Sequence, residues 1–284
     1  MSAYDERGKF VHQRVGLSIP RQAGKSFVAI AWVVYLVVAK HATVLWTDHN
    51  YSTTCEMLRR FRDVFGKKPN DPTARYRQFN RKLMAVNNKT AQEAMFFKGG
   101  GSLHFCTRTK SAALGYSFDV IVYDEAQELT DEHLQALAPT TAAGALHNTQ
   151  SVYTGTPCRA GSSAYKFADF RAEFADGAQP DDACWWEWGV PEVGDVRDFK
   201  RLYEVNPSLG RTADMSAIKS GVVQLTDMAA AQEYYGYWLP SGTMRRAVPR
   251  ELWDACKVAA PVTRGLRTFG VKFTPDGMRA AVCV

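Results

Sequence analysis

The stretch VGLSIPRQAGKSFVAIAWVVY (Val15–Tyr35) decides the fold, because it joins a short apolar segment to a long apolar one through a polar loop. The loop ends in Gly24-Lys25-Ser26, as phosphate-binding loops do, although such loops carry a glycine where Ile19 stands. In that motif, backbone N–H groups converge on phosphates at a helix N-terminus, where the helix dipole also favours anions. We therefore predict a nucleotide site, in which Lys25 pairs with the β- and γ-phosphates and Ser26 holds Mg²⁺ through its hydroxyl. The predicted nucleotide-binding residues are Arg21, Gln22, Ala23, Gly24, Lys25 and Ser26.

The composition is ordinary for a soluble globular protein, with 46% hydrophobic and 23% charged residues in a chain of 284. The longest apolar run, Phe27–Ala39, would span roughly 20 Å as a helix, less than the ~30 Å hydrocarbon core of a bilayer. We predict a buried helix there, apolar nearly all round, and no membrane partner. A mostly polar N-terminus argues against a signal peptide, and six scattered cysteines without a C-x-x-C pair indicate reduced thiols in a cytosol.

Strand and helix signals alternate along the chain, which predicts an α/β fold with a mainly parallel central sheet. The predicted strands are 14–19, 43–47, two within 94–107 joined through Gly99-Gly100-Gly101, one within 118–129 and one at 150–157. The predicted helices are 24–39, 51–65, 162–172, 213–224 and 227–238. Near the C-terminus, 266–284 reads as a β-hairpin around the turn Pro275-Asp276-Gly277.

A second motif supports the first. The apolar strand in VIVYDEAQ (120–127) ends in two adjacent acids, Asp124 and Glu125. A P-loop ATPase needs one carboxylate at a strand tip to hold hydrated Mg²⁺ and an adjacent one to orient or deprotonate the attacking water. Asp124 suits the first role and Glu125 the second. The alternative is an acidic helix start that is stabilised by the helix dipole.

A third motif, SVYTGTP (151–157), is a buried strand that ends in small hydroxyl residues. Beside a γ-phosphate, Thr154 and Thr156 are suited to sensing hydrolysis. Thr-Gly-Thr-Pro is also an ordinary strand-ending turn, so the motif alone does not decide.

Basic residues are concentrated in one segment. Nine of them lie between Glu56 and Lys82, against three acidic ones, while the whole chain carries a net charge of +6. Such an excess attracts phosphate backbones, although a solvated helix face has the same composition. The predicted DNA-binding residues are Arg75, Arg77 and Arg81.

These pieces together resemble the large subunit of a tailed-phage terminase. The matching segments are PRQAGKS (20–26), GGGSLHF.TRT (99–109), GYSFDVIVYDEAQELTDE (115–132), YTGTP (153–157), NPSLG (206–210) and GVKFTPDG (270–277). Terminases typically use a P-loop that lacks the first glycine and carries a basic residue, here Arg21. The resemblance implies that Asp124 and Glu125 are the Walker B pair and that Thr154-Gly155-Thr156 is the coupling motif.

The resemblance also implies a function: a P-loop ATPase that uses ATP and Mg²⁺ to translocate double-stranded DNA into a procapsid. Implied partners are the portal protein, the terminase small subunit and further copies in a ring, in the cytoplasm of the infected bacterial host and transiently at the portal. The expected domains are an ATPase at 1–240, a linker at 241–265 and the start of an RNase H-like nuclease at 266–284.

The sequence departs from the family pattern in three places. Leu114 stands where many relatives have an arginine, and only a short polar N-terminus precedes the P-loop, without the usual adenine-contacting segment. Lys272 stands where the nuclease strand normally bears a metal-binding aspartate. We therefore expect the endonuclease to be incomplete in this chain.

Two other functions are also compatible with the sequence. The acidic motif also resembles that of a helicase, which would require a second motor domain, and a truncated, non-catalytic docking module would leave the P-loop silent. The arginine that stabilises transition-state charge is Arg21, Arg108 or Arg159, or comes from a neighbouring subunit; the position of Arg21 in the loop favours it.

Overall fold

The computed structural model describes residues 3–109, 116–141, 144, 146–159, 164–240, 270–273 and 280–283. The chain divides into two compact units, residues 1–245 and 246–284. The helices of the first unit are α1 (Lys25–Ala39), α2 (Tyr51–Phe65), α3 (Arg77–Asn80), α4 (Asp131–Leu137), α5 (Lys166–Ala172), α6 (Leu202–Val205), α7 (Met215–Val223) and α8 (Asp227–Tyr235). No helix in these ranges is long and apolar enough to cross a membrane.

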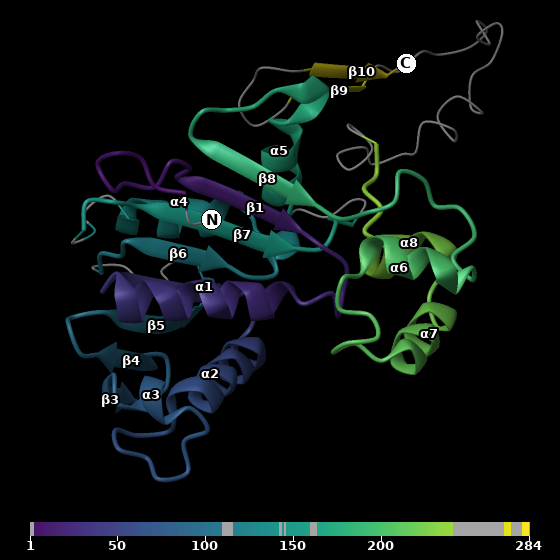
Figure 1. Cartoon of the computed structure of the whole chain (residues 1–284). Helices are drawn as coiled ribbons and strands as arrows, with labels where there is room; N and C mark the ends of the chain where they lie inside the picture. The colour runs from purple at the N-terminus through teal and green to yellow at the C-terminus, as the bar shows by residue number, and fades with distance from the viewer. Residues whose placement is uncertain are drawn as a thin grey trace, which may run out of the picture. The chain divides into compact units, whose positions relative to one another are not determined.

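One eight-stranded sheet forms the centre of the first unit (Figure 1). Its strands are β1 (Arg14–Ser18), β2 (Thr43–Asp48), β3 (Leu83–Asn87), β4 (Ala94–Phe97), β5 (Ser102–Thr107), β6 (Val120–Tyr123), β7 (Gln150–Gly155) and β8 (Ala183–Glu187). They lie in the order β3-β4-β5-β2-β6-β7-β1-β8. The strands from β5 to β8 in this order pair in parallel, whereas β3, β4 and β5 pair antiparallel. The predicted α/β fold with a mainly parallel sheet is confirmed.

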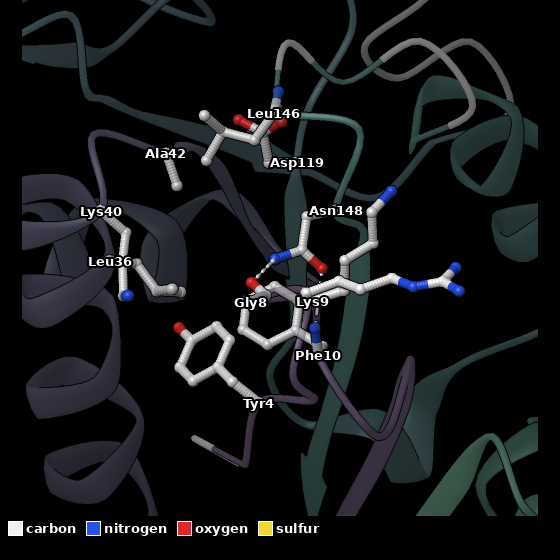
Figure 2. Close-up of a pocket in the computed structure, with 11 residues that line it drawn as sticks. Tyr4, Gly8, Lys9, Phe10, Leu36, Lys40, Ala42, Asp119, Leu146 and Asn148 are labelled. Atoms are coloured by element: carbon white, nitrogen blue, oxygen red, sulfur yellow. Dashed lines mark hydrogen bonds between the residues drawn. The ribbon is translucent and has the colours of Figure 1, made fainter.

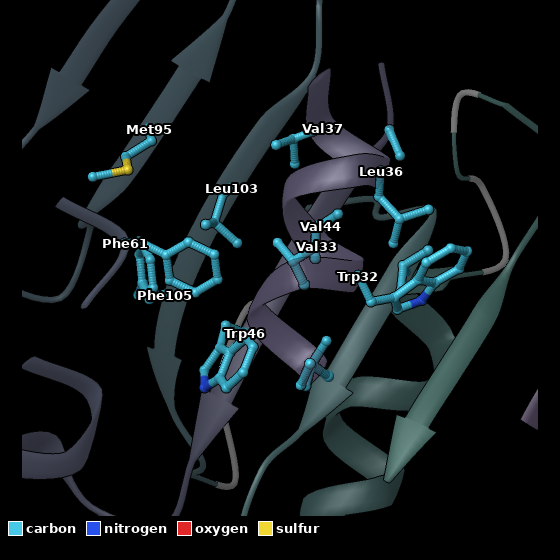
Figure 3. Close-up of a cluster of buried hydrophobic side chains, with 14 of the residues drawn as sticks. Trp32, Val33, Leu36, Val37, Val44, Trp46, Phe61, Met95, Leu103 and Phe105 are labelled. Carbon is cyan, nitrogen blue, oxygen red and sulfur yellow. The ribbon is translucent and has the colours of Figure 1, made fainter. Parts of the chain in front are cut away.

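Helices cover both faces of the sheet. Val33 of α1 and Phe61 of α2 belong to one buried cluster with Trp46 of β2 (Figure 3). The neighbouring residue in β2, Leu45, points to the other side, where it packs with Leu137 of α4. Successive side chains alternate between the faces of a strand, so the continuous apolar run of β2 is what a strand covered on both sides requires.

Helix α1 differs from the prediction of a helix buried all round. Val33 and Leu36 are fully buried, but Phe27 is 77% exposed and Val28 is 49% exposed. One side of α1 packs against the sheet. No described residue covers the opposite side of its first turn. An apolar sequence therefore did not mean burial here, and the exposed side lies at the end of α1 that carries the predicted site.

The three helices α6, α7 and α8 gather beside the sheet and form their own small core (Figure 1). Ile218 and Val222 of α7 pack there with Tyr235 of α8, and all three are fully buried. Tyr235 also donates a hydrogen bond to the carbonyl oxygen of Val196 (2.7 Å), which joins α8 to the segment after β8. This helical group follows the sheet in sequence, and its helix α8 is hydrogen-bonded to the predicted nucleotide loop.

The second unit shows one described element, an antiparallel pair of β9 (Gly270–Phe273) and β10 (Ala280–Cys283). Lys272 lies opposite Ala281 in this pair. The predicted hairpin strands are therefore present. The predicted turn at 275–277 and the linker at 241–265 lie outside the described residues, and the assignment to an RNase H-like domain stays a prediction.

Candidate nucleotide site

The candidate site forms where four parallel strands end side by side. Strands β2, β6, β7 and β1 are neighbours in the sheet and run in the same direction, so their carboxyl ends meet at one edge. The loop 19–24 follows β1, Asp48 ends β2, Asp124 follows β6 and Thr154 lies next to the last residue of β7. Open α/β sheets bind their ligands at this edge. The fold thus brings the three predicted motifs together.

The loop before α1 has the backbone of an anion cradle. Gln22 and Gly24 both have positive φ values, 58° and 96°, and Gly24 is the N-cap of α1. A Cβ at Gly24 would lie 2.7 Å from Oγ of Ser208, so the NPSLG segment packs against the loop. Glycine is needed at this position both for the left-handed backbone and for the close approach.

Ile19 explains why the first glycine of the pattern is dispensable. Its N–H donates to the carbonyl oxygen of Gly155 (3.1 Å), so the strand pairing with β7 continues through this residue. Its φ is not positive, and its side chain is buried with Leu17 and Ala23. Because its backbone is that of an ordinary strand, this position does not require glycine. The buried isoleucine side chain instead packs beneath the loop.

Asp124 connects the three motifs through its two carboxylate oxygens. Oδ1 accepts hydrogen bonds from the Thr154 hydroxyl (2.6 Å) and from the N–H of Glu125 (3.0 Å). Oδ2 lies 3.5 Å from the hydroxyl of Ser26, which donates to it. Mg²⁺ is usually held by one or two protein oxygens together with substrate phosphates and water, and Ser26 and Asp124 fit that donor set. The described residues contain no cluster of three or more acidic, histidine or cysteine ligands.

Glu125 stands in a left-handed backbone conformation, with φ of 51°. Its carboxylate pairs with Nδ1 of His49, and the other ring nitrogen of His49 lies 2.8 Å from the side-chain amide of Asn50. The residue that is predicted to orient water is therefore held by the segment that follows β2. His49 was not predicted from the sequence, because a single histidine after a strand has no recognisable spacing.

Arg108 fixes the backbone of this edge and is 3% exposed. Its guanidinium donates to the carbonyl oxygens of Thr47 (3.0 Å), Asp124 (2.7 Å) and Glu125 (3.1 Å). Burial lowers its pKa, while the charges of Asp48 and Asp124 oppose that shift. With these carbonyl contacts, Arg108 holds strand ends together and is unsuited to reaching a phosphate.

Asp48 is a third acid at this edge and was not predicted. It is fully buried, and neither carboxylate oxygen makes a hydrogen bond of ordinary geometry among the described residues, although the nearby Trp46 indole acts to lower its pKa. Burial, followed by the charge of Asp124, raises the pKa of Asp48 to about 8, although Arg108 opposes the shift. Carboxyl groups perturbed in this way are concentrated at functional sites.

Arg21 and Arg159, two of the three candidate charge-stabilising arginines, share one partner on α8. Arg21 donates through Nε to Glu233 (2.5 Å), and Arg159 donates to the other oxygen of the same carboxylate (2.8 Å). The backbone N–H of Arg21 also donates to the carbonyl oxygen of Glu233 (2.8 Å). Burial opposes ionisation of Glu233, but the two arginines outweigh it and lower its pKa. The loop is thereby tied to the helical group.

An open cavity of about 520 Å³ lies over the loop, and its volume is in the range of small-molecule sites. Asp124 and Glu125 line it together with residues of α2 and with Thr212 to Asp214. All but one of the predicted nucleotide-binding residues line it, and the exception, Ala23, is buried beneath the loop. The predicted residues in the lining are Arg21, Gln22, Gly24, Lys25 and Ser26.

The predicted DNA-binding arginines lie elsewhere. Arg75, Arg77 and Arg81 are exposed around α3, and the described residues show no ion pair to any of them. By contrast, Arg59 and Arg60 on α2 both pair with Glu56. Part of the basic segment is therefore already neutralised, and the three predicted arginines are not paired with acids in the described part of the chain.

The opposite edge of the sheet has a smaller cavity, of about 250 Å³, beside Tyr4, Lys40 and Asp119 (Figure 2). The N-terminal segment lines it and is held in place by Asn148, which accepts from the N–H of Phe10 (2.8 Å) and donates to the carbonyl oxygen of Gly8 (3.3 Å). Asp119, just before β6, is fully buried. Thr43 donates to one of its oxygens through N–H (2.8 Å) and hydroxyl (2.7 Å), and the N–H of Leu146 donates to the other (2.7 Å).

Comparison with known proteins identifies the sequence pattern. A family model for the N-terminal part of the T4likevirus-type terminase large subunit matches residues 17–188. This range is more than half of the chain and contains the loop, Asp124, Glu125 and the strand β7. No curated protein matches the sequence.

Solved structures agree with the family model in fold. The large terminase of bacteriophage HK97 superposes with a TM-score of 0.65 at 11% identity, covering 96% of this chain and 58% of that one. The large terminase ATPase domain of Thermus phage P74-26 gives 0.51 at 13%, covering 81% and 91%. The large terminase of the thermophilic bacteriophage D6E, in complex with ADP, gives 0.51 at 10%, covering 80% and 48%. The chain thus spans about half the length of two of these proteins, and likeness at such low identity concerns the fold alone.

Proposed function

The chain belongs to the terminase large subunit family, and from this premise we propose that it carries the ATPase of a viral DNA-packaging motor. The proposed motor hydrolyses ATP and translocates double-stranded DNA into a procapsid. One observation carries the proposal: the carboxylate of Asp124 contacts Ser26 at the start of α1 and Thr154 in β7. The phosphate loop, the metal-binding acid and the coupling strand therefore meet at one point.

In this function the residues of the loop bind the phosphates. The backbone N–H groups up to Ser26 and the ammonium of Lys25 hold the β- and γ-phosphates at the positive end of α1. Bound Mg²⁺ supplies neutralisation of the charge that develops on the phosphates. Ser26 and Asp124 would hold the ion, and Arg21, in the same loop, would stabilise the charge of the transition state.

Glu125 orients the attacking water and accepts its proton. A carboxylate beside the metal-binding acid is the group that this reaction class requires. Thr154, Gly155 and Thr156 form the coupling motif, because Thr154 donates directly to Asp124 and any shift of that carboxylate reaches β7. The N–H of Thr156 is held by the side chain of Gln127 (3.2 Å), in the turn after Glu125. Through these two contacts, a change at the carboxylate of Asp124 on hydrolysis would be passed to the backbone of β7.

DNA and protein partners are the less direct part of the proposal. The exposed arginines Arg75, Arg77 and Arg81 support a surface that binds DNA phosphates without reading sequence. We infer the portal protein, the small subunit and a ring of copies from the family alone, together with action in the host cytoplasm at the portal. We further propose that this chain has no nuclease activity, because Lys272 occupies the expected metal-binding position of β9.

The test is ATP hydrolysis with and without double-stranded DNA. We expect DNA-stimulated turnover in the wild type and none in Lys25→Ala, because Lys25 pairs with the phosphates. Lys40→Ala is the matched control, since Lys40 lies at the opposite end of α1 and does not line the cavity. Wild-type turnover in Lys25→Ala would overturn the P-loop assignment.

Two alternatives have distinct outcomes in the same assay. Strand separation of a duplex by the purified chain would favour a helicase-like, DNA-dependent ATPase. Absence of nucleotide binding in the wild type would favour a docking module.

The DNA surface is tested by salt dependence. Reversing Arg75, Arg77 and Arg81 to glutamate should weaken binding and flatten the log–log salt slope, because fewer counterions are released. An unchanged slope would place the DNA on another face.

A further inference from the structure

Phe27 is far more exposed to solvent than is usual for a phenylalanine in an apolar helix. It is the third residue of α1, and 77% of its surface is open to solvent, although a phenylalanine is usually buried. Phe27 also belongs to the lining of the 520 Å³ cavity. An aromatic ring left open in the rim of a polar cavity has a free face to offer a ligand.

The position of Phe27 relative to the phosphate loop limits which part of a ligand it meets. Ser26 points inward, since its hydroxyl contacts Asp124. The next residue of a helix is rotated by about 100° around the axis, so Phe27 lies on a different side of α1 from Ser26, and it is exposed there. A nucleotide whose phosphates lie beside Lys25 and Asp124 extends through the same cavity, and Phe27 belongs to the lining of that cavity.

We propose that Phe27 is the platform on which the base of the bound nucleoside triphosphate stacks. The inference rests on the proposed ATPase function and adds to it the contact that binds the base. The lining of the same cavity also includes Met57 of α2 and the aromatic residue Tyr234 of α8. The base therefore has an apolar surface available in a cavity otherwise lined mainly by charged and polar groups.

Stacking has a chemical consequence for specificity. A phenyl ring offers a π-face and no hydrogen bond, and every nucleobase has a π-face. Phe27 therefore contributes affinity for the base without distinguishing adenine from guanine. The contribution is the same before and during hydrolysis, so its loss changes KM and leaves kcat in place.

The test measures KM for ATP and for GTP in Phe27→Ala. We expect KM to rise about tenfold for both nucleotides, with kcat within about twofold of the wild type. Val28→Ala is the matched control, because Val28 is also exposed, at 49%, is adjacent in α1 and does not line the cavity. Phe27→Trp should keep the wild-type KM, and its fluorescence should change when ATP binds.

Inorganic tripolyphosphate separates the base contact from the phosphate contacts. As a competitive inhibitor it should bind Phe27→Ala and the wild type equally well, since it has no base. Equal KM values for ATP in Phe27→Ala and wild type would overturn the inference while leaving the ATPase intact. Weaker binding of tripolyphosphate to Phe27→Ala would overturn it as well, because the ring would then support the phosphate loop. Absence of ATP binding in the wild type would overturn both proposals.

Discussion

Asp119 and Asp48 are both fully buried in the central sheet, but at opposite edges and in opposite electrostatic circumstances. Asp119, at the amino edge, accepts hydrogen bonds on both oxygens, from Thr43 and from the N–H of Leu146. Asp48, at the carboxyl edge, has no hydrogen bond of ordinary geometry on either oxygen among the described residues, and it faces the charge of Asp124, with Arg108 and the Trp46 indole only partly compensating. The carboxylate of Asp119 therefore has hydrogen-bond donors that compensate for its burial, whereas that of Asp48 lacks them among the described residues.

This difference separates structural burial from functional burial. Buried polar groups in proteins are nearly always hydrogen-bonded, and an exception calls for a reason. At the amino edge the reason for burial is local, because Asp119 fixes the starts of two strands. At the carboxyl edge Asp48 lies beside Arg108, Asp124 and Glu125, where the proposed ATPase places its metal and water. Such local conflicts are expected where a site is built for a ligand.

The largest expected effect is on the pH dependence of stability. The pKa of Asp48 is raised to about 8 in the folded protein, so the folded state keeps a proton that the unfolded state loses above about pH 4. The contribution of Asp48 to the stability of the wild type should therefore fall as pH rises from about 4 to about 8. Asp48→Asn has no such titration. Each unit of difference between the folded and unfolded pKa values corresponds to about 1.4 kcal/mol. At pH 8 the free energy of unfolding of Asp48→Asn should therefore exceed that of the wild type by several kcal/mol.

Chemical denaturation at pH 5 and pH 8, without nucleotide or metal, measures this effect. The difference in unfolding free energy between Asp48→Asn and wild type should grow with pH. Parallel stabilities at the two pH values would mean that Asp48 is satisfied in solution, and the contrast with Asp119 would disappear.

A smaller effect is expected at Asp119. In Asp119→Asn one acceptor oxygen becomes an amide that faces the donors of Thr43 or Leu146. Leaving a buried donor unpaired should cost about 1–3 kcal/mol of stability. Hydrolysis of ATP by the folded variant should be unchanged, because Asp119 lies at the edge away from the loop. A lowered kcat in fully folded Asp119→Asn would show that the two edges are not independent.

The smallest effect is expected for Glu233→Gln. Glu233 pairs with Arg21 and Arg159, whose side chains are about half exposed or more, so the pairs are screened by solvent and contribute less than about 1 kcal/mol. Because these arginines lower the pKa of Glu233, its contribution is present near neutral pH and is lost as pH falls through the folded pKa. This pH dependence has the opposite sign to that of Asp48. Denaturation of wild type and Glu233→Gln at pH 7 and at low pH checks this prediction. A difference in unfolding free energy between the two proteins that grows as pH falls would contradict it.

Much of this architecture could be predicted from the sequence, because the relevant signals are local. The alternation of apolar segments predicted the parallel sheet, and α2 begins and ends where its amphipathic pattern does. Gly24-Lys25-Ser26 and Asp124-Glu125 were recognisable because each stands at the end of a strand, and strand order then brings them together. The short, less regular elements β3, α3, α4 and α6 were missed, because a few residues carry too weak a pattern.

The remaining site residues depend on tertiary structure. Asp48, His49 and Glu233 have no motif of their own, and each acquires its role from a partner far away in sequence: Asp124, Glu125 and Arg21. The burial of α1 was predicted wrongly for its outward side, since apolar composition does not tell which neighbours are present. Phe27 is exposed because no described element covers it.

The central claim, that the carboxyl edge of the sheet is an ATPase site, is tested most directly by Glu125→Gln. The amide keeps the shape of the side chain and leaves the contact between Asp124 and Ser26 in place, but it cannot accept a proton from water. Equilibrium ATP binding and steady-state hydrolysis should be measured on the same preparation. We predict wild-type affinity for ATP and a hydrolysis rate lowered on the order of 10²-fold or more. Wild-type hydrolysis, or an equal loss of binding and hydrolysis, would contradict the assignment of this edge to catalysis.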